Sequence, residues 1–358
     1  MKTEHDLFAP ARVVMALLVL SLLLHSAAQA AECPAPSLFA PGATLNVRID
    51  NDLFGGVGQD QGYSNGFLVT AVSPNLVSYH HDPCLPAIVR LLNRYLDWLQ
   101  PEGFDAQNMT LGLGQTLYTP TDRTQTGLIV DDRPYTAAVL LSTGYNVRRG
   151  DDLRTSQIRL GIVGPSARGE QVQNGWHNII GVDHFDGWRN QLRDEPVIQL
   201  VHERRRRVAS HGKADGWGGG VVGHWGGSLG NFATYANAGA EWRWGYRVPN
   251  DFGSAPLGPA GENTSPMPAA EEGRAAWSGH FFIALDARWV LHDITLDGNT
   301  FKTSHSVDKR PLVADVGTGL TMTRGAWRFA FTHYFRTQEF KGQRHNPVYG
   351  NFTISHRF

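Results

Sequence analysis

The chain has 358 residues and a formal net charge of −1, from 32 Lys and Arg against 33 Asp and Glu. This balance excludes a strongly basic protein and gives no sign of a nucleic-acid partner. The 40 Gly, 10 Trp and 10 Tyr favour an all-β protein with tight turns and aromatic side chains at an interface. The length allows one large β domain or two average ones.

The first 30 residues have the pattern of an export signal. Basic residues precede a short apolar core at 13–24, and Ala28-Gln29-Ala30 is a small-x-small cleavage site. This core is too short to span a bilayer, which takes roughly 20 residues in a helix. We therefore expect a removed signal peptide at 1–30 and one exported domain at 31–358. A retained membrane anchor is the alternative.

Cys33 and Cys84 are the two cysteines of the chain. Exported proteins meet oxidising conditions, so the pair could form a disulfide. Two free thiols are the alternative, and neither cysteine has a catalytic context.

Apolar and polar residues alternate along many segments, which is the strand signal. In the segment 232–246, one parity is apolar or small, while the other carries Glu241 and Arg243. The same pattern recurs to the terminal Phe358 and predicts about twelve strands. They lie near 43–52, 64–73, 107–118, 134–147, 154–164, 195–208, 213–225, 232–247, 277–291, 311–323, 327–338 and 347–358.

Strands of about ten residues with aromatic residues near their ends favour a transmembrane antiparallel β-barrel. A soluble sandwich, with the apolar face buried on a second sheet, is the alternative. An even strand number puts both termini in the periplasm, so the loops at 53–63, 119–133, 165–194, 226–231, 292–310 and 339–346 become extracellular. We expect a helix at 83–99 and a flexible loop at 249–275 on the periplasmic side.

The most distinctive motif is the stretch Gly161–Gly181, where a strand breaks at Gly164-Pro165 and a short polar helix pattern follows. Gln173 and His177 lie one turn apart and share a face of this helix. Histidine titrates near neutral pH, so His177 is our candidate general base. A surface histidine is the alternative.

Asn51 and Asp52 end the first predicted strand. A carboxylate and an amide oxygen suit a hard cation such as Ca²⁺, although Asn-Asp is also a common turn cap. By alternation Asn51 should point outward and Asp52 inward. Both serve one site only if the strand end is bulged or the site straddles the barrel wall.

Other polar residues fall at the same predicted rim. Ser64 could be a nucleophile, but it lacks the Gly-x-Ser-x-Gly context of the hydrolase elbow. Arg123 is the basic residue of the second outer loop best placed to meet a phosphate, with a solvated loop residue as the alternative. The run Arg204–Arg207, at the inner end of a strand, indicates a topology or lipid-headgroup feature rather than a nucleic-acid site.

Several of these motifs together resemble the outer-membrane lipid A 3′-O-deacylase family, the LpxR-like proteins of Gram-negative bacteria. The matching pieces are Asn51-Asp52, Tyr63-Ser64-Asn65-Gly66, Gln115 with Tyr118-Thr119-Pro120, Asp132-Arg133-Pro134-Tyr135 and, above all, Gly161–Gly181. The resemblance covers nearly the whole mature chain.

The resemblance implies a twelve-stranded barrel and Ca²⁺-dependent hydrolysis of the ester that holds the 3′ acyloxyacyl chain on lipid A. The family's essential His falls on His177, its helix Gln on Gln173, and its Asn-Asp pair on Asn51 and Asp52. A family Thr is replaced by Ser64, which keeps the hydroxyl, and a family Lys aligns loosely with Arg123. The acidic residue six positions after the His is Asp183, one methylene shorter than Glu, and is a candidate metal ligand.

We therefore expect a monomeric hydrolase of the Gram-negative outer membrane, acting on the lipid A part of lipopolysaccharide at the extracellular face. His177 would be the base, Asp52 and Asp183 metal ligands, and Asn51, Ser64 and Gln173 orienting groups. One alternative is an outer-membrane phospholipase with Ser64 as nucleophile; another is a porin-like barrel without enzymatic activity.

Overall fold

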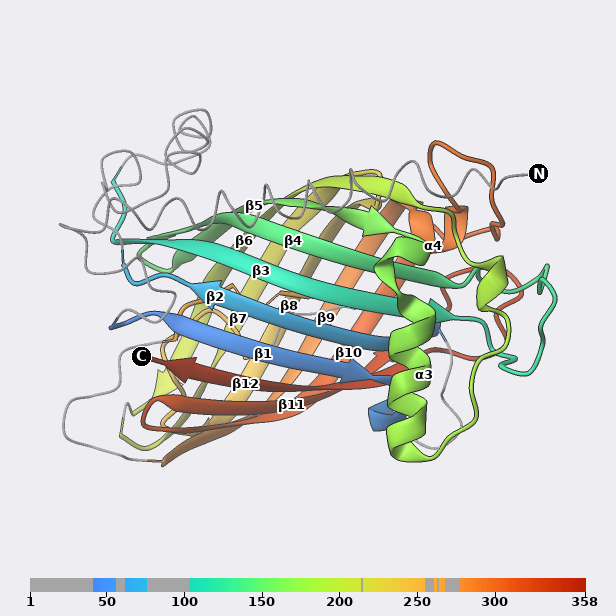
Figure 1. Ribbon diagram of the computed structural model, residues 1–358. Helices are drawn as coiled ribbons and strands as arrows, with labels where there is room; N and C mark the ends of the chain where they lie inside the picture. Colours follow the sequence, from blue (N-terminus) through green and yellow to red (C-terminus); the bar gives the residue numbers. More distant parts are fainter. Residues whose placement is uncertain are drawn as a thin grey trace, which may run out of the picture.

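The computed structural model describes residues 41–55, 62–75, 103–213, 215–254, 261–262, 264–267 and 277–358. Within them, twelve antiparallel strands form one closed barrel, in which β1 pairs with both β2 and β12 (Figure 1). The strands are β1 (Thr44–Asn51), β2 (Gly62–Val72), β3 (Ala106–Thr119), β4 (Thr136–Arg149), β5 (Asp152–Val163), β6 (Glu195–Gly212), β7 (Trp217–Gly230), β8 (Ala233–Tyr246), β9 (Trp277–Asp293), β10 (Leu312–Arg324), β11 (Trp327–Arg336) and β12 (Val348–Arg357). The predicted twelve-stranded barrel is confirmed, and the sandwich is excluded.

Short helical elements lie in the connections between strands. The main one is α3 (Gly169–Ile180), which confirms the predicted loop helix; the others are η2 (Asp52–Gly55), η4 (Pro165–Ala167), η5 (Trp188–Asn190) and α4 (Ile294–Asp297). The predictions for the signal peptide at 1–30, the helix at 83–99 and the Cys33–Cys84 disulfide fall outside the described residues.

The two ends of the barrel differ. At one end, where β1 begins and β12 finishes, tight turns at 150–151, 213–216 and 325–326 join neighbouring strands; we call this end the turn rim. The opposite end, where β1 finishes at Asn51, carries α3 and is called the helix rim (Figure 1).

The outer face of the barrel is apolar because alternate residues of each strand point outward. Trp289 and Leu291 on β9 are 56% and 54% exposed, and Trp242 and Trp244 on β8 are also exposed. An apolar surface of this extent is typical of a membrane-facing wall rather than of a water-soluble monomer. Among the described residues, no helix is long and apolar enough to cross a bilayer.

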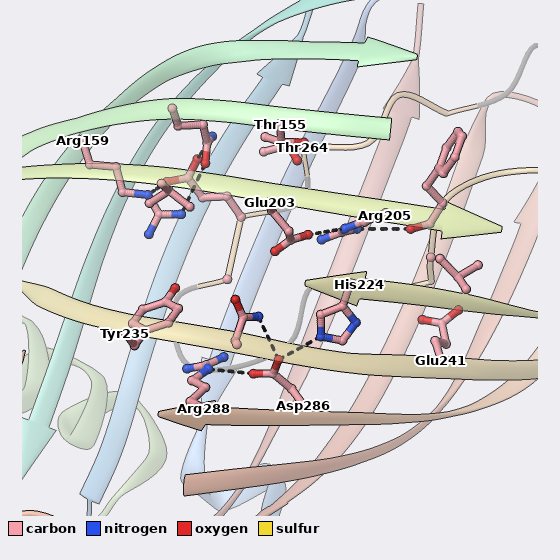
Figure 2. A pocket seen from close by; sticks show the side chains of 18 residues that line it. Thr155, Arg159, Glu203, Arg205, His224, Tyr235, Glu241, Thr264, Asp286 and Arg288 are labelled. Carbon is pink, nitrogen blue, oxygen red and sulfur yellow. Dashed lines mark hydrogen bonds and ion pairs between the residues drawn. The ribbon is translucent and has the colours of Figure 1, made fainter. Parts of the chain in front are cut away.

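The inward side chains form ion pairs inside the barrel. Asp286 accepts hydrogen bonds from Arg288 at 2.7 Å and contacts Nε2 of His224 at 2.8 Å. Arg336 donates two bonds of 2.7 Å to Asp315. Figure 2 shows Asp286, Arg288 and His224 with other charged side chains around a lumen cavity of about 90 Å³.

Aromatic side chains fill the lumen nearer the helix rim. Four buried tyrosines, Tyr63, Tyr118, Tyr334 and Tyr349, pack together there. The Tyr63 hydroxyl donates to Asp50 at 2.6 Å, and the guanidinium of Arg133 lies 4.8 Å from the centre of the Tyr118 ring. The barrel interior is therefore packed with side chains at this level, unlike the water-filled channel of a porin.

The prediction of a flexible periplasmic loop at 249–275 is wrong for the residues of that segment that the structure describes. They bond to inward side chains of the barrel because their charges complement those of the lumen. Asp251 accepts hydrogen bonds from Arg328, at 2.7 Å, and from Arg243. Glu262 accepts bonds from Ser142 and Gln157 at 2.6 and 2.9 Å and lies 3.2 Å from Arg159.

Replacing Asp251 with asparagine should lower the free energy of unfolding by about 3–5 kcal/mol, because two buried guanidinium groups would lose their shared counter-charge. The measurement is the temperature at which the protein in a gel changes from the mobility of the folded barrel to the mobility of the unfolded chain. Asp308→Asn is the matched control, since Asp308 pairs with Lys341 on the surface, where both side chains are more than two-thirds exposed. Equal melting temperatures for the two variants would contradict this role of Asp251.

The glycine-rich segment 226–231 was predicted as an outer loop, and this prediction is wrong. β7 continues to Gly230, and only residues 231 and 232 separate it from β8. Glycine is a poor strand former, so the composition indicated a loop. Here the strands approach closely: a Cβ on Gly226 would lie 2.3 Å from the carbonyl oxygen of His202.

Candidate active site

The loop between β5 and β6 places α3 against the outside of the barrel. Gly169, the first residue of α3, packs against β4 and Trp188; a Cβ there would lie 2.5 Å from Cβ of Ala137. Gly164 has φ +109, and a Cβ would meet the backbone of Arg193 at 2.6 Å. Only glycine allows the turn and the close approach at these two positions.

An apolar cluster beneath this loop attaches it to the wall. Its buried members come from β3, β4 and the loop itself: Leu117, Tyr135, Ala137, Ala167, Phe185 and Trp188. Gln115 on β3 adds a hydrogen bond of 2.6 Å from its amide to the carbonyl of Ala167. The helix is therefore held on the outer face of β3 and β4 by packing as well as by hydrogen bonds.

His177 is oriented on both sides of its ring. Nδ1 lies 2.6 Å from the carbonyl oxygen of Asp183, and Nε2 lies 3.0 Å from the side-chain amide nitrogen of Gln173. A carbonyl only accepts hydrogen bonds, so Nδ1 carries the proton and Nε2 keeps its lone pair. This is the tautomer that a general base acting through Nε2 requires.

The end of α3 explains why Asp183 reaches His177. Gly181 adopts φ +72, and its N–H donates to the carbonyl oxygen of His177. This left-handed cap reverses the chain and brings the carbonyl of Asp183 back to the imidazole. The ring of Phe185 then packs on the imidazole, with 5.6 Å between ring centres.

Asn51, Ser64 and Thr119 form a second group at the helix rim. The Asn51 side chain donates to the carbonyl of Ser64 at 3.1 Å, and the hydroxyls of Ser64 and Thr119 are hydrogen-bonded to each other. All three residues are buried.

Two local features lie beside Asn51 and Asp52, a bulge in β2 and the end of β1. The register of β2 against β3 shifts between Tyr63 and Asn65, so Ser64 is the extra residue of a bulge. β1 ends at Asn51, and the 3-10 turn η2 begins at Asp52, whose side chain is buried. β1 keeps its register with β2 and β12 up to Asn51, so alternation still places Asn51 outward, and only Asp52, in η2, leaves the strand pattern.

The second outer loop contacts the third. The carbonyl of Arg123 accepts a hydrogen bond of 2.9 Å from the N–H of Asp186, next to Phe185. Arg189 and Asn190 both donate to the carbonyl of Thr126, at 3.0 and 2.9 Å. The half-buried Arg123 is thus held beside the loop segment that orients His177.

The two groups of predicted site residues both contact the last part of β3. Leu117 belongs to the same apolar cluster as Phe185, and Thr119, two residues on, bonds Ser64. Figure 1 shows α3 at the helix rim, where it contacts β3 and β4. Thr119 and Phe185 were missed as site residues: Thr119 lies inside a recognised motif, while no spacing marks Phe185.

An ionic network borders the site within the barrel mouth. Arg133 pairs with Glu339 at 2.9 Å, and Glu339 also pairs with Arg336 at 2.8 Å. Burial raises the pKa of Glu339, but the two guanidinium groups outweigh it, so the pKa lies below its usual range. Above this network, a cavity of about 230 Å³ is lined by Arg133, Asp132 and His345 among others.

The donor groups near Asn51 suit calcium in their chemistry. They comprise the Asp52 carboxylate with amide and hydroxyl oxygens, which are the hard oxygen ligands that Ca²⁺ prefers. Oε1 of the buried Gln173 has no hydrogen-bond partner among the described residues. Those residues contain no cluster of three or more His, Cys, Asp or Glu side chains, so an all-carboxylate cage is not what they would provide. The Asp183 side chain is exposed, and its carbonyl oxygen is engaged with His177.

A closed barrel with an apolar outer wall, a packed lumen and a polar site at one rim defines an outer-membrane β-barrel protein with a candidate hydrolytic site. The family model described as "Outer membrane protein LpxR" matches residues 14–358, and the chain belongs to this family. Membership implies an outer-membrane lipid A deacylase, which confirms the predicted family and membrane.

Two solved structures show different degrees of similarity to the chain. LpxR from Salmonella typhimurium superposes with a TM-score of 0.68 at 20% identity, covering 88% of this chain and 100% of that chain. The β domain of the Bordetella autotransporter Brka gives a TM-score of 0.42 at 8% identity, over 89% of this chain and 100% of that one. No curated protein matches the sequence.

Proposed function

We propose that this protein hydrolyses the ester that holds the 3′-linked acyloxyacyl chain on lipid A, with His177 as general base. The observation that carries the proposal is the orientation of His177, whose Nδ1 proton is bound by the carbonyl of Asp183, so that Nε2 is the unprotonated nitrogen. Family membership supports the substrate class.

The site lies on the outer face of the wall, so the substrate need not leave the membrane. Phe67, three residues beyond Ser64 on β2, is 48% exposed on that face. The acyl chains of lipid A could remain along this apolar wall while the ester reaches the rim.

In the proposed reaction, Nε2 of His177 takes a proton from a water molecule while the oxygen of that water attacks the ester carbonyl carbon. The tetrahedral intermediate collapses by breaking the bond to the sugar oxygen. The imidazolium returns the proton to that oxygen, which leaves a free 3′ hydroxyl on lipid A and a carboxylic acid as the second product. A positioned base of this kind contributes typically 10²–10⁴ in rate.

The other predicted residues would position the reactants. Gln173, whose amide donates to Nε2 of His177 in this structure, would turn to the approaching substrate and so free the Nε2 lone pair for water. Asn51 and Ser64 would orient the water or the carbonyl. Arg123 would bind a glucosamine phosphate through a charge-assisted contact.

We include Ca²⁺ in the proposal, with Asp52 as its principal carboxylate ligand and Asp183 as a candidate second ligand through its exposed side chain. A bound calcium ion would supply positive charge to stabilise the oxyanion of the intermediate. The residues near Asn51 meet the chemical requirement for oxygen donors.

The proposed orientation places the helix rim at the extracellular face. In outer-membrane barrels the periplasmic connections are short and the extracellular ones are longer. Three of the five connections at the turn rim are short, and the other two, 73–105 and 247–276, are long. At the helix rim only the connection 231–232 is short, and the other five have ten or more residues. We propose a monomer, because one chain closes the barrel and supplies all the site residues.

The role of Ser64 separates direct attack by water from a phospholipase-like mechanism with a serine nucleophile. Ser64→Ala should lower the deacylation rate by roughly fivefold, through lost orientation of the water or carbonyl, because a hydrogen bond is worth about 1 kcal/mol. Ser64→Thr keeps the hydroxyl and should stay closer to wild type. Loss of all activity in Ser64→Ala, together with an acyl adduct on Ser64 detected by mass spectrometry, would contradict the proposed mechanism.

Substrate class is tested by offering two lipids together. Purified protein in detergent, supplied with Ca²⁺ and an equimolar mixture of lipid A and phosphatidylethanolamine, should release fatty acid from lipid A only. Release of lysophospholipid with intact lipid A would replace our proposal with the phospholipase alternative.

A further inference from the structure

The apolar outer face ends early on β5 and β6. Toward the helix rim, the outward residues of these strands are apolar: Ile158, Leu160, Ile198 and Leu200, of which Ile198 is 60% exposed. Toward the turn rim, the outward positions become polar at Ser156 and His202, which are hydrogen-bonded at 2.8 Å. The hydrocarbon-facing band therefore stops at this pair of residues.

Two arginines follow on the same outer face. Arg154 on β5 and Arg204 on β6 are register partners, directly opposite each other across the strand pair. They point outward because their chain neighbours Thr155, Glu203 and Arg205 line the lumen cavity. Figure 2 shows these three neighbours on the inner side of the wall.

The pair lacks a counter-ion in the part of the chain that the structure describes. There, neither the Arg154 nor the Arg204 guanidinium has a hydrogen-bond or ion-pair partner. Like charges directly opposite on neighbouring strands are destabilising. Arg206, the next outward arginine on β6, differs because Asp152 lies 4.0 Å from it.

The neighbouring side chains are typical of a membrane interface. Trp225 on β7 is the register partner of Arg204 on its other side and is 42% exposed. Tryptophan and arginine at the edge of an apolar band mark the level of lipid headgroups. Two adjacent guanidinium groups match the oxygens of a phosphate, which arginine binds in a fork geometry.

We propose that Arg154 and Arg204 form a binding site for the phosphodiester group of an anionic phospholipid on the outer wall near the turn rim. The choice of a phospholipid, rather than a lipid A phosphate, rests on the orientation given under the proposed function, in which the turn rim faces the periplasmic leaflet. The site is separate from His177 and takes no part in the hydrolysis.

Native mass spectrometry of the full barrel released from detergent tests this site, with dioleoyl phosphatidylglycerol as probe. Wild type should retain one phosphatidylglycerol, and the double variant Arg154→Gln/Arg204→Gln should bind it at least roughly tenfold more weakly. Arg206→Gln is the matched control and should bind as wild type does. A second double variant, Arg154→Lys/Arg204→Lys, keeps the charge and should retain part of the binding.

Parallel arms separate the sources of phosphate. Phosphatidylethanolamine should be retained less than phosphatidylglycerol, because it carries no net charge. Equal retention of phosphatidylglycerol by wild type and the glutamine double variant would overturn the proposal. So would a wild-type protein that retains lipid A in preference to phosphatidylglycerol, if the double variant loses that preference. Lipid A deacylation should be unchanged in the double variant, so this inference and the proposed function fail independently.

Discussion

Replacing His177 with alanine is expected to lower the rate of lipid A deacylation by about 10²–10⁴-fold. The imidazole is held by Gln173 at Nε2 and by the carbonyl of Asp183 at Nδ1, so removal deletes both the base and its orienting contacts. The rate is measured from the mass spectrum of lipid A over time with purified protein in detergent. The barrel should still fold, because His177 lies on α3, outside the strand ladder.

His184→Ala is the matched control for this variant. His184 lies seven residues further along the same loop, is exposed and bonds the side chain of Asn178 at 2.8 Å. It should keep near wild-type activity, since its side-chain hydrogen bond goes to Asn178 and to none of the proposed site residues. If His177→Ala and His184→Ala lose activity equally, or if neither does, His177 is not the base.

The second large effect is expected at Asp52. Asp52→Asn keeps the size of the side chain but removes the negative charge proposed to hold Ca²⁺, so the deacylation rate at limiting calcium should fall by about 10²–10³-fold. Chelation of calcium in wild type should have a comparable effect. The measurement is the deacylation rate as a function of free Ca²⁺.

A higher calcium concentration should recover part of the rate of Asp52→Asn, because weakened binding is overcome by mass action. Asp308→Asn, at an exposed carboxylate, should leave the calcium dependence unchanged. If chelator does not change the wild-type rate and Asp52→Asn has a normal rate, the proposed role of calcium is contradicted.

The barrel could be predicted because the membrane requires one apolar face along every strand. The alternation of Phe281 and Leu285 with Asp286 follows directly from this requirement, and the same parity is found in β9. Strand boundaries were harder where composition opposed pairing. Gly226 and Gly230 read as loop residues, but they pair in β7 because the neighbouring backbone leaves no room for a Cβ.

The helix could be predicted from Gly164 through Gly181 because its glycines and its polar spacing are local signals. The position of Asp52 and the bulge at Ser64 could not, because η2 begins at Asp52 and Ser64 is the extra residue between β2 and β3. Both are consequences of how three strands meet at the rim.

The contacts between the segment 249–275 and the barrel lumen could not be predicted from composition. Its Pro, Gly and Ala residues resemble those of any mobile connection, and its order depends on long-range partners. Asp251 and Glu262 are held by side chains of several strands far from them in the chain. Such pairs leave no periodic signal in the sequence around 249–275.

The most direct test of the account is tandem mass spectrometry of lipid A after incubation with the purified wild-type protein and Ca²⁺. The account predicts loss of one acyloxyacyl unit and a new free hydroxyl at the 3′ position, with His177→Ala leaving lipid A intact. Unaltered lipid A in both samples, or an acyl chain removed from a different position, would contradict it.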